Sequence, residues 1–145
     1  MQTVYSDDHR KHFPRGELFG GILVRPFECP ERMDYVLGRI EAVGLGEVLA
    51  PTAFGLEPIG RVHSADYLDF LRTCHEEWKE AGFEGDAIAA SWPSRSTGSR
   101  VPRHIDGRIG YYALAAETAI TAGTWDAAQA SADVALSAQK LVADG

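Results

Sequence analysis

The Ala-rich stretch from Thr124 to Ala143 constrains the fold of this chain more than any other feature. Its pattern predicts a helix that is apolar on nearly all sides, capped by the hydroxyl of Thr124. A helix of this kind needs neighbours that cover it on several sides. The rest of the fold must therefore supply extensive packing partners for it.

The residues up to Ala50 predict the opening of a sheet. Met1–Tyr5 is typical of a short strand, and from Glu31 apolar residues recur every three or four positions, which predicts an amphipathic helix ended by Gly44. The apolar run Glu47–Ala50 before Pro51 fits a second buried strand. Strand, helix, strand indicates an α/β fold, and because a sheet normally has more strands, we expect the rest of the sheet to be missing from this sequence.

The middle of the chain predicts one helix, one loop and a further helix. Ser64 should cap a helix that runs to about Ala81 and packs through one apolar face: Tyr67, Leu68, Leu71, Cys74 and Trp78. Residues 82–104 lack periodicity, and long structureless segments usually bind or dock something. Within them, Arg95 to Arg103 is expected to be an extended, basic, exposed loop. Apolar residues from Ile109 to Ile120 predict the further helix.

Composition excludes several classes of function. The net charge of -7 argues against a nucleic-acid partner, because phosphate backbones need a clustered basic surface. The same acidity suits a cationic substrate, although it is also an ordinary source of solubility. No apolar run is long enough to cross a bilayer, and the N-terminus lacks a signal region, so we expect no membrane partner and a cytoplasmic location.

No group of residues in this chain predicts a metal site or a catalytic centre. The five histidines lie on different predicted elements, and Cys29 and Cys74 are far apart in the sequence. Phosphate-binding glycine motifs and a serine nucleophile elbow are also missing. We therefore assign no catalytic residue and no metal ligand to the chain itself.

Two carboxylates, Asp106 and Glu117, have unusual surroundings. On a continuous helix they would share one side at a separation of roughly 16 Å. That distance is too large for a proton-sharing pair, but it suits two anionic points that meet a long, multiply charged cation. An ordinary solvated helix face is the alternative interpretation.

Four stretches of the sequence carry a resemblance to a known family. Residues 60–71, GRVHSADYLDFL, resemble a segment near the N-terminus of the histone deacetylase and acetoin-utilisation superfamily. Residues 17–28, 87–93 and 105–120 extend the similarity over nearly the whole chain. Together they resemble the bacterial acetylpolyamine amidohydrolases.

The resemblance implies an α/β arginase-deacetylase fold, a parallel sheet flanked by helices. Residues 1–145 would be the N-terminal portion of a single deacetylase domain. In that family a zinc ion held by Asp, His and Asp activates water, a His pair serves as acid and base, and a Tyr stabilises the oxyanion. These groups belong to later motifs, so zinc is the implied cofactor and its ligands are expected outside this chain.

The resemblance also implies roles at the entrance of the site. It places Phe19 where an aromatic ring lines a tunnel, and Asp106 and Glu117 where carboxylates meet ammonium groups of the substrate. The family often has Tyr and Glu at the positions of Phe19 and Asp106. Residues 82–104 would be an insertion that packs across a homodimer and narrows the entrance.

Three functions follow as hypotheses. The first is a zinc-dependent amidohydrolase that removes acetyl groups from acetylated polyamines or related small cationic amines. The second is a histone deacetylase-like enzyme that acts on acetyl-lysine. The third is a non-catalytic dimerisation or interaction module, if the natural chain is this short.

Overall fold

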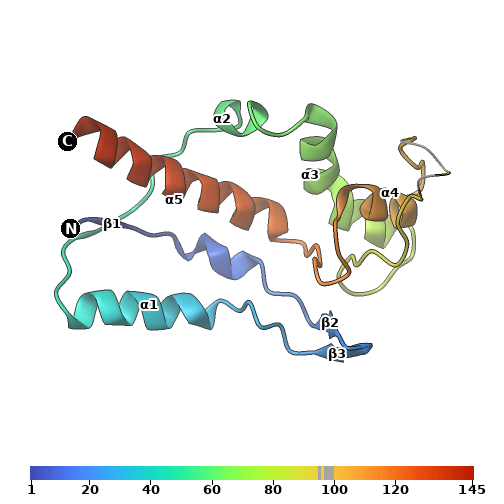
Figure 1. The fold of residues 1–145 in the computed structure, drawn as a ribbon, viewed down its shortest axis with the longest axis horizontal. Helices are drawn as coiled ribbons and strands as arrows, with labels where there is room; N and C mark the ends of the chain where they lie inside the picture. Colours follow the sequence, from blue (N-terminus) through green and yellow to red (C-terminus); the bar gives the residue numbers. More distant parts are fainter. Residues whose placement is uncertain (95, 97–99) are drawn as a thin grey trace. The chain divides into compact units, whose positions relative to one another are not determined.

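The computed structural model describes residues 1–94, 96 and 100–145 (Figure 1). Arg95 and residues 97–99 of the expected insertion loop lie outside the described residues. The chain forms two compact units. Residues 1–13, 28–63 and 123–145 make the first unit, and residues 14–27 and 64–122 make the second.

The first unit contains the strand, helix and strand that the sequence predicts. β1 (Thr3–Val4) pairs in parallel with β4 (Val48–Leu49), and α1 (Glu31–Ala42) lies between them in the sequence. The backbone amides of Thr3 and Tyr5 each donate at 2.9 Å to carbonyls flanking and within β4. Gly44, which follows α1, has a φ of 60°, a left-handed conformation that glycine adopts without a steric penalty. The predicted opening of an α/β sheet is confirmed.

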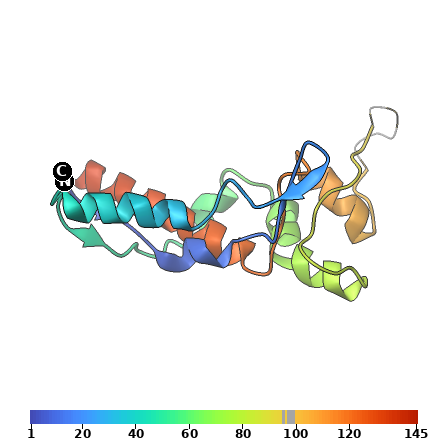
Figure 2. The same cartoon turned by 90° about the horizontal axis from the view of Figure 1, so that it is seen from below.

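The long helix α5 (Thr124–Asp144) lies beside the short 3₁₀ helix η1 (Asp7–Lys11) and β1, as two views show (Figures 1 and 2). The prediction that Thr124 caps this helix is wrong. Gly123 occupies the cap position, and no side chain caps it. The Thr124 hydroxyl instead lies 2.8 Å from Nδ1 of His12, so it is engaged with the segment that follows η1.

Polar side chains on α5 hold a neighbouring segment of the first unit. Asp133 and Ser137 are buried, and they accept hydrogen bonds from the backbone amides of Phe54 at 2.9 Å and Thr52 at 2.8 Å. Ala127 is the one buried apolar residue of this unit in the described part of the chain, whereas Val142 is 83% exposed. The first unit therefore buries little apolar surface of its own.

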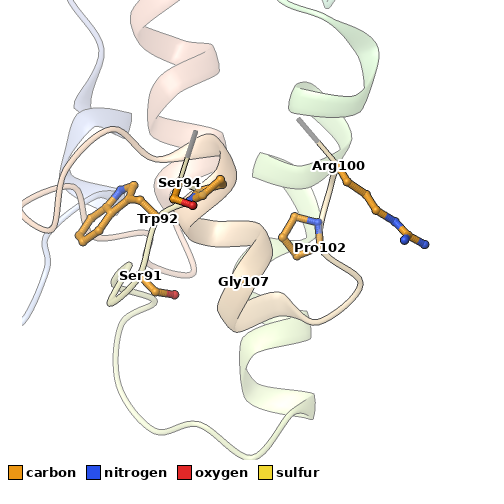
Figure 3. A pocket seen from close by; sticks show the side chains of 7 residues that line it. Ser91, Trp92, Ser94, Arg100, Pro102 and Gly107 are labelled. Carbon is orange, nitrogen blue, oxygen red and sulfur yellow. The ribbon is translucent and has the colours of Figure 1, made fainter. Parts of the chain in front are cut away.

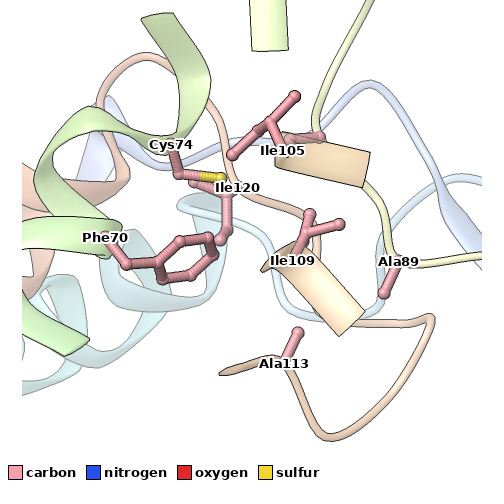
Figure 4. Close-up of a cluster of buried hydrophobic side chains, with 8 residues drawn as sticks. Phe70, Cys74, Ala89, Ile105, Ile109, Ala113 and Ile120 are labelled. Carbon is pink, nitrogen blue, oxygen red and sulfur yellow. The ribbon is translucent and has the colours of Figure 1, made fainter. Parts of the chain in front are cut away.

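The second unit contains the hydrophobic core (Figure 4). α3 (Ala65–Glu80) contributes Phe70 and Cys74, and α4 (Ile105–Tyr112) contributes Ile105 and Ile109. Phe70 is 1% exposed, yet the predicted face of this helix omitted it. It stands one turn before Cys74, and its ring stacks on Tyr112 with centroids 4.5 Å apart. The helix and the position of Ser64 at its N-cap are confirmed, but the Ser64 side chain makes no capping hydrogen bond. Phe70 is added to the predicted buried face.

An antiparallel hairpin, which the sequence interpretation missed, also belongs to the second unit. β2 (Glu17–Phe19) pairs with β3 (Ile22–Val24) around Gly20 and Gly21. Both glycines have positive φ values, 59° and 82°, as a tight hairpin turn of the type I′ class requires. Two adjacent glycines between short apolar runs were the available signal.

The helix predicted over Ile109 to Ile120 is wrong in its second half. α4 ends at Tyr112, and Ile120 forms an isolated antiparallel bridge with Ala87 through two backbone hydrogen bonds of 2.9 Å. Ala119 and Ile120 are buried in the core by this extended pairing. Tertiary contacts thus override the helix propensity of an Ala-rich segment.

Within the described part of the chain, no helix is both long and apolar enough to cross a membrane.

Candidate functional site

The three residues expected to bind substrate all lie in the second unit, on different elements. Phe19 ends β2 and is 59% exposed. Its ring meets Phe27 edge to face, with centroids 5.5 Å apart. Glu17 accepts a hydrogen bond from the amide of Phe27 at 3.1 Å, so the segment that follows β3 is held against the start of β2. The hairpin therefore presents an aromatic pair at its surface.

Asp106 lies in the first turn of α4 and is exposed. Its Oδ1 accepts a hydrogen bond from the amide of Gly107 at 2.8 Å. A carboxylate at this end of a helix interacts favourably with the helix dipole, typically by about 0.3–1 kcal/mol. Asp106 therefore has a local structural role beside any role toward a ligand.

Glu117 is exposed in the turn between α4 and the bridge at Ile120. Ala119 donates its amide to the Glu117 carbonyl at 3.2 Å, and this bond belongs to the turn and not to a helix. The expected arrangement of Asp106 and Glu117 on one continuous helix is therefore wrong. No hydrogen bond or ion pair among the described residues joins these carboxylates to each other or to a cation, so both remain available to a ligand.

A pocket of about 320 Å³ borders α4 at Gly107 (Figure 3). Its lining comes from both sides of the expected insertion loop and from α4: Ser91, Trp92, Pro93, Ser94, Arg100, Pro102 and Gly107. Trp92 donates its indole N–H to the carbonyl of Ala113 at 2.9 Å. This bond satisfies a carbonyl at the C-terminal end of α4. The segments around Trp92 and Pro102 thus both lie against α4.

Two glycines of α4 allow that attachment. A Cβ at Gly110 would collide with the carbonyl oxygen of Ser91, and a Cβ at Gly107 would lie 2.8 Å from Cβ of Pro102. These glycines are three residues apart, so they share one face of the helix. The close approach of the loop backbone to α4 depends on this face having no side chains.

Two polar side-chain contacts join α4 to α3. Tyr112 donates its hydroxyl to Asp66 at 2.9 Å, and Arg108 forms an ion pair with Glu77. Hydrogen bonds from Ser64 and then Tyr112 lower the pKa of Asp66, whereas burial and the bond to Asp66 raise the pKa of Tyr112. Sequence reasoning missed both pairs, because their members are far apart in the chain.

Cys74 is not activated as a nucleophile, and the described residues of the second unit form no metal site. Burial raises the pKa of Cys74 to about 12, and the nearby Glu77 adds to this effect, so the thiol stays protonated and unreactive. Among residues 1–94, 96 and 100–145, no three His, Cys, Asp or Glu side chains lie close enough to hold one ion. A zinc ion bound by two carboxylates and a histidine does not fit the residues described.

No protein-family model matches this chain, but individual proteins match it over its whole length. Acetylpolyamine amidohydrolase 2 of Pseudomonas aeruginosa is 51% identical over 145 residues, and the acetylpolyamine amidohydrolase of Mycoplana ramosa is 46% identical over the same length. All of this chain is covered in both comparisons, but it spans only about 42% of the length of each relative.

A solved structure gives the same result. The crystal structure of acetylpolyamine aminohydrolase from Burkholderia pseudomallei, from an iodide soak, matches with a TM-score of 0.88 and 32% identity. The match covers all of this chain and 42% of the crystallised one. The predicted α/β arginase-deacetylase fold, present as its N-terminal portion, is confirmed.

Proposed function

We infer that this chain belongs with the acetylpolyamine amidohydrolases, whose N-terminal part it matches from end to end. We propose that it supplies that part of a zinc-dependent enzyme which removes acetyl groups from acetylated polyamines or related small cationic amines. The carrying observation is the 51% identity over all 145 residues, which includes the segments that contain Phe19, Asp106 and Glu117.

The zinc ion and the groups that activate water would be held by residues outside this sequence. The histidines and carboxylates described here do not assemble a site for the metal. The contribution of this chain would be the entrance of the active site, where a substrate is selected before it reaches the catalytic groups.

Selection by charge is the role we propose for Glu117 and Asp106. Both carboxylates are exposed, lack an ion pair among the described residues and could approach the ammonium groups of a flexible polyamine. Phe19 would contribute an aromatic wall, because its exposed ring, backed by Phe27, can contact methylene groups or an ammonium group. Residues 82–104 would form a homodimer contact, which Trp92 and Val101 favour as large exposed apolar residues at 44% and 40% exposure.

A hybrid protein tests the proposed substrate class. In it, this chain replaces the matching part of the Pseudomonas aeruginosa acetylpolyamine amidohydrolase 2. We expect the hybrid to deacetylate an acetylated diamine with a higher kcat/KM than an acetyl-lysine peptide. A hybrid that prefers the peptide would support the histone deacetylase-like alternative and overturn the polyamine assignment.

A further inference from the structure

A second pocket in the second unit has cationic or nitrogen-donor side chains at half of its lining residues. Its volume is about 310 Å³, and its lining residues are Arg15, His75, Lys79, Phe83, Glu84 and Gly85. This basic pocket contains none of the residues proposed to contact substrate, Phe19, Asp106 and Glu117, although Phe83, Glu84 and Gly85 belong to the expected insertion 82–104. It stands out in a chain whose net charge is -7.

Two structural features bring the cations together. His75 and Lys79 are four residues apart on α3, so they share one face of the helix. Arg15 is positioned from the other side, because its backbone amide donates to the carboxylate of Asp86 at 2.6 Å. This bond anchors Arg15 beside the turn that follows α3.

The guanidinium of Arg15 lies beside a glycine of that turn. Gly85 has a φ of 83°, and a Cβ built at Gly85 would lie 3.8 Å from a guanidinium nitrogen of Arg15. The turn itself is held by the stack of Phe83 on Trp78, whose ring centroids are 4.2 Å apart. The pocket thus has a fixed aromatic wall, and the guanidinium lies beside backbone that carries no side chain.

The two cations of the basic pocket form no ion pair within the described chain. Neither the guanidinium of Arg15 nor the ammonium of Lys79 has a hydrogen bond or ion pair there. Two other cations of this unit are paired: Arg72 bonds to Asp69 at 2.8 Å, and Arg108 bonds to Glu77. Among the lining residues, the two fixed positive charges meet one carboxylate, Glu84. The Asp86 carboxylate lies outside this lining, on the backbone amide of Arg15.

We propose that the basic pocket binds a phosphate-bearing small anion. Arginine presents a planar fork of donors that fits two oxygens of one phosphate, lysine adds a point charge, and the His75 ring adds a further N–H donor. A volume of about 310 Å³ accommodates a group of the size of diphosphate. The ligand is therefore opposite in charge to the proposed polyamine substrate, and it binds at a separate place.

Isothermal titration with pyrophosphate at low salt tests this proposal on the chain or on the hybrid protein. We expect saturable binding that Arg15→Gln and Lys79→Gln each weaken about tenfold to a hundredfold, since each removes a charge-assisted hydrogen bond. Glu84→Gln should strengthen binding. The matched control is Arg72→Gln, which removes an ion-paired cation from the same helix and should change the affinity by less than about twofold.

Three results would overturn the proposal. The first is that pyrophosphate shows no saturable binding. The second is that Arg72→Gln lowers the affinity for pyrophosphate as much as Lys79→Gln does. The third is that a tricarboxylate binds as tightly as pyrophosphate, which would contradict the assignment to phosphate. Circular dichroism of Arg15→Gln and Lys79→Gln provides the folding control. Acetyl-group hydrolysis is not part of the readout, so failure of the proposed enzyme activity leaves this test intact.

Discussion

At the scale of the residue, Glu117 makes the most specific prediction about substrate recognition. In the hybrid protein, Glu117→Gln should lower kcat/KM for an acetylated diamine about tenfold to a hundredfold. A charge-assisted hydrogen bond in a narrow site contributes about 1.5–3 kcal/mol, whereas an exposed ion pair contributes about 0–1 kcal/mol. Asp106→Asn should act in the same sense but more weakly, because Asp106 already accepts the amide of Gly107.

Steady-state kinetics with an uncharged acetylated amine is the control for this prediction. Its kcat/KM should change little in Glu117→Gln, because it lacks the ammonium group that the carboxylate would meet. Glu80→Gln on α3 serves as a matched surface variant with no assigned role. Equal losses for the charged and uncharged substrates would mean that Glu117 supports the turn between α4 and the bridge at Ile120.

Cys74 makes a prediction about pH dependence. Burial raises its pKa from 9.0 to about 12 in the folded protein, so between these values the unfolded chain releases a proton that the folded chain retains. The stability contribution is fully present below pH 9 and is lost as the pH rises toward 12, by about 1.4 kcal/mol per pH unit. Urea unfolding of the hybrid at several alkaline pH values should show this slope, and Cys74→Ala should reduce it. An unchanged slope would contradict the assigned burial.

At the scale of the element, the contact between α4 and the segment around Ser91 depends on the bare face of the helix. Gly110→Ala should destabilise the hybrid by about 1–3 kcal/mol, because the new methyl group meets the carbonyl of Ser91. Gly38→Ala in α1 is the matched control, since nothing lies within 4 Å of its Cβ position. It should stabilise by about 0.5–1 kcal/mol. Thermal unfolding measures both, and a neutral Gly110→Ala would refute the close approach.

Sequence patterns predicted the helices whose positions depend on residues close together in the chain. The apolar repeat between Glu31 and Gly44 and the Ser64 boundary of α3 were sufficient to place two helices. They failed at Ile120, where pairing with Ala87 extends an Ala-rich segment, and at Thr124, whose hydroxyl serves His12. In both cases the decisive partner is remote in the sequence. The residues proposed for the substrate entrance came from the family resemblance. The expected placement of Asp106 and Glu117 on one helix is wrong because α4 ends at Tyr112.

At the scale of the whole molecule, the apolar core is unevenly distributed. Phe70, Ile109 and their neighbours fill the second unit, whereas the first unit buries Ala127 and leaves Tyr35 at 80% and Val142 at 83% exposure. Contiguous exposed apolar surface promotes association. We therefore predict that the chain alone is oligomeric or poorly soluble, as size-exclusion chromatography with light scattering would measure. A monodisperse monomer with a cooperative thermal transition would contradict this prediction, because it would show that the chain folds stably by itself.

The assignment of residues 1–145 to a single domain stays a prediction.

The most direct measurement of the central claim compares zinc content and hydrolysis of an acetylated diamine in the chain alone and in the hybrid protein. The proposal is that this chain supplies the entrance of an acetylpolyamine amidohydrolase, and that the metal ligands lie outside it. The chain alone should bind no zinc at a specific site and release no acetate. The hybrid should bind about one zinc ion per chain and hydrolyse the substrate, with activity lost on chelation and restored by zinc. A folded, zinc-loaded hybrid that releases no acetate, or a tight zinc site with turnover in the chain alone, would contradict the account.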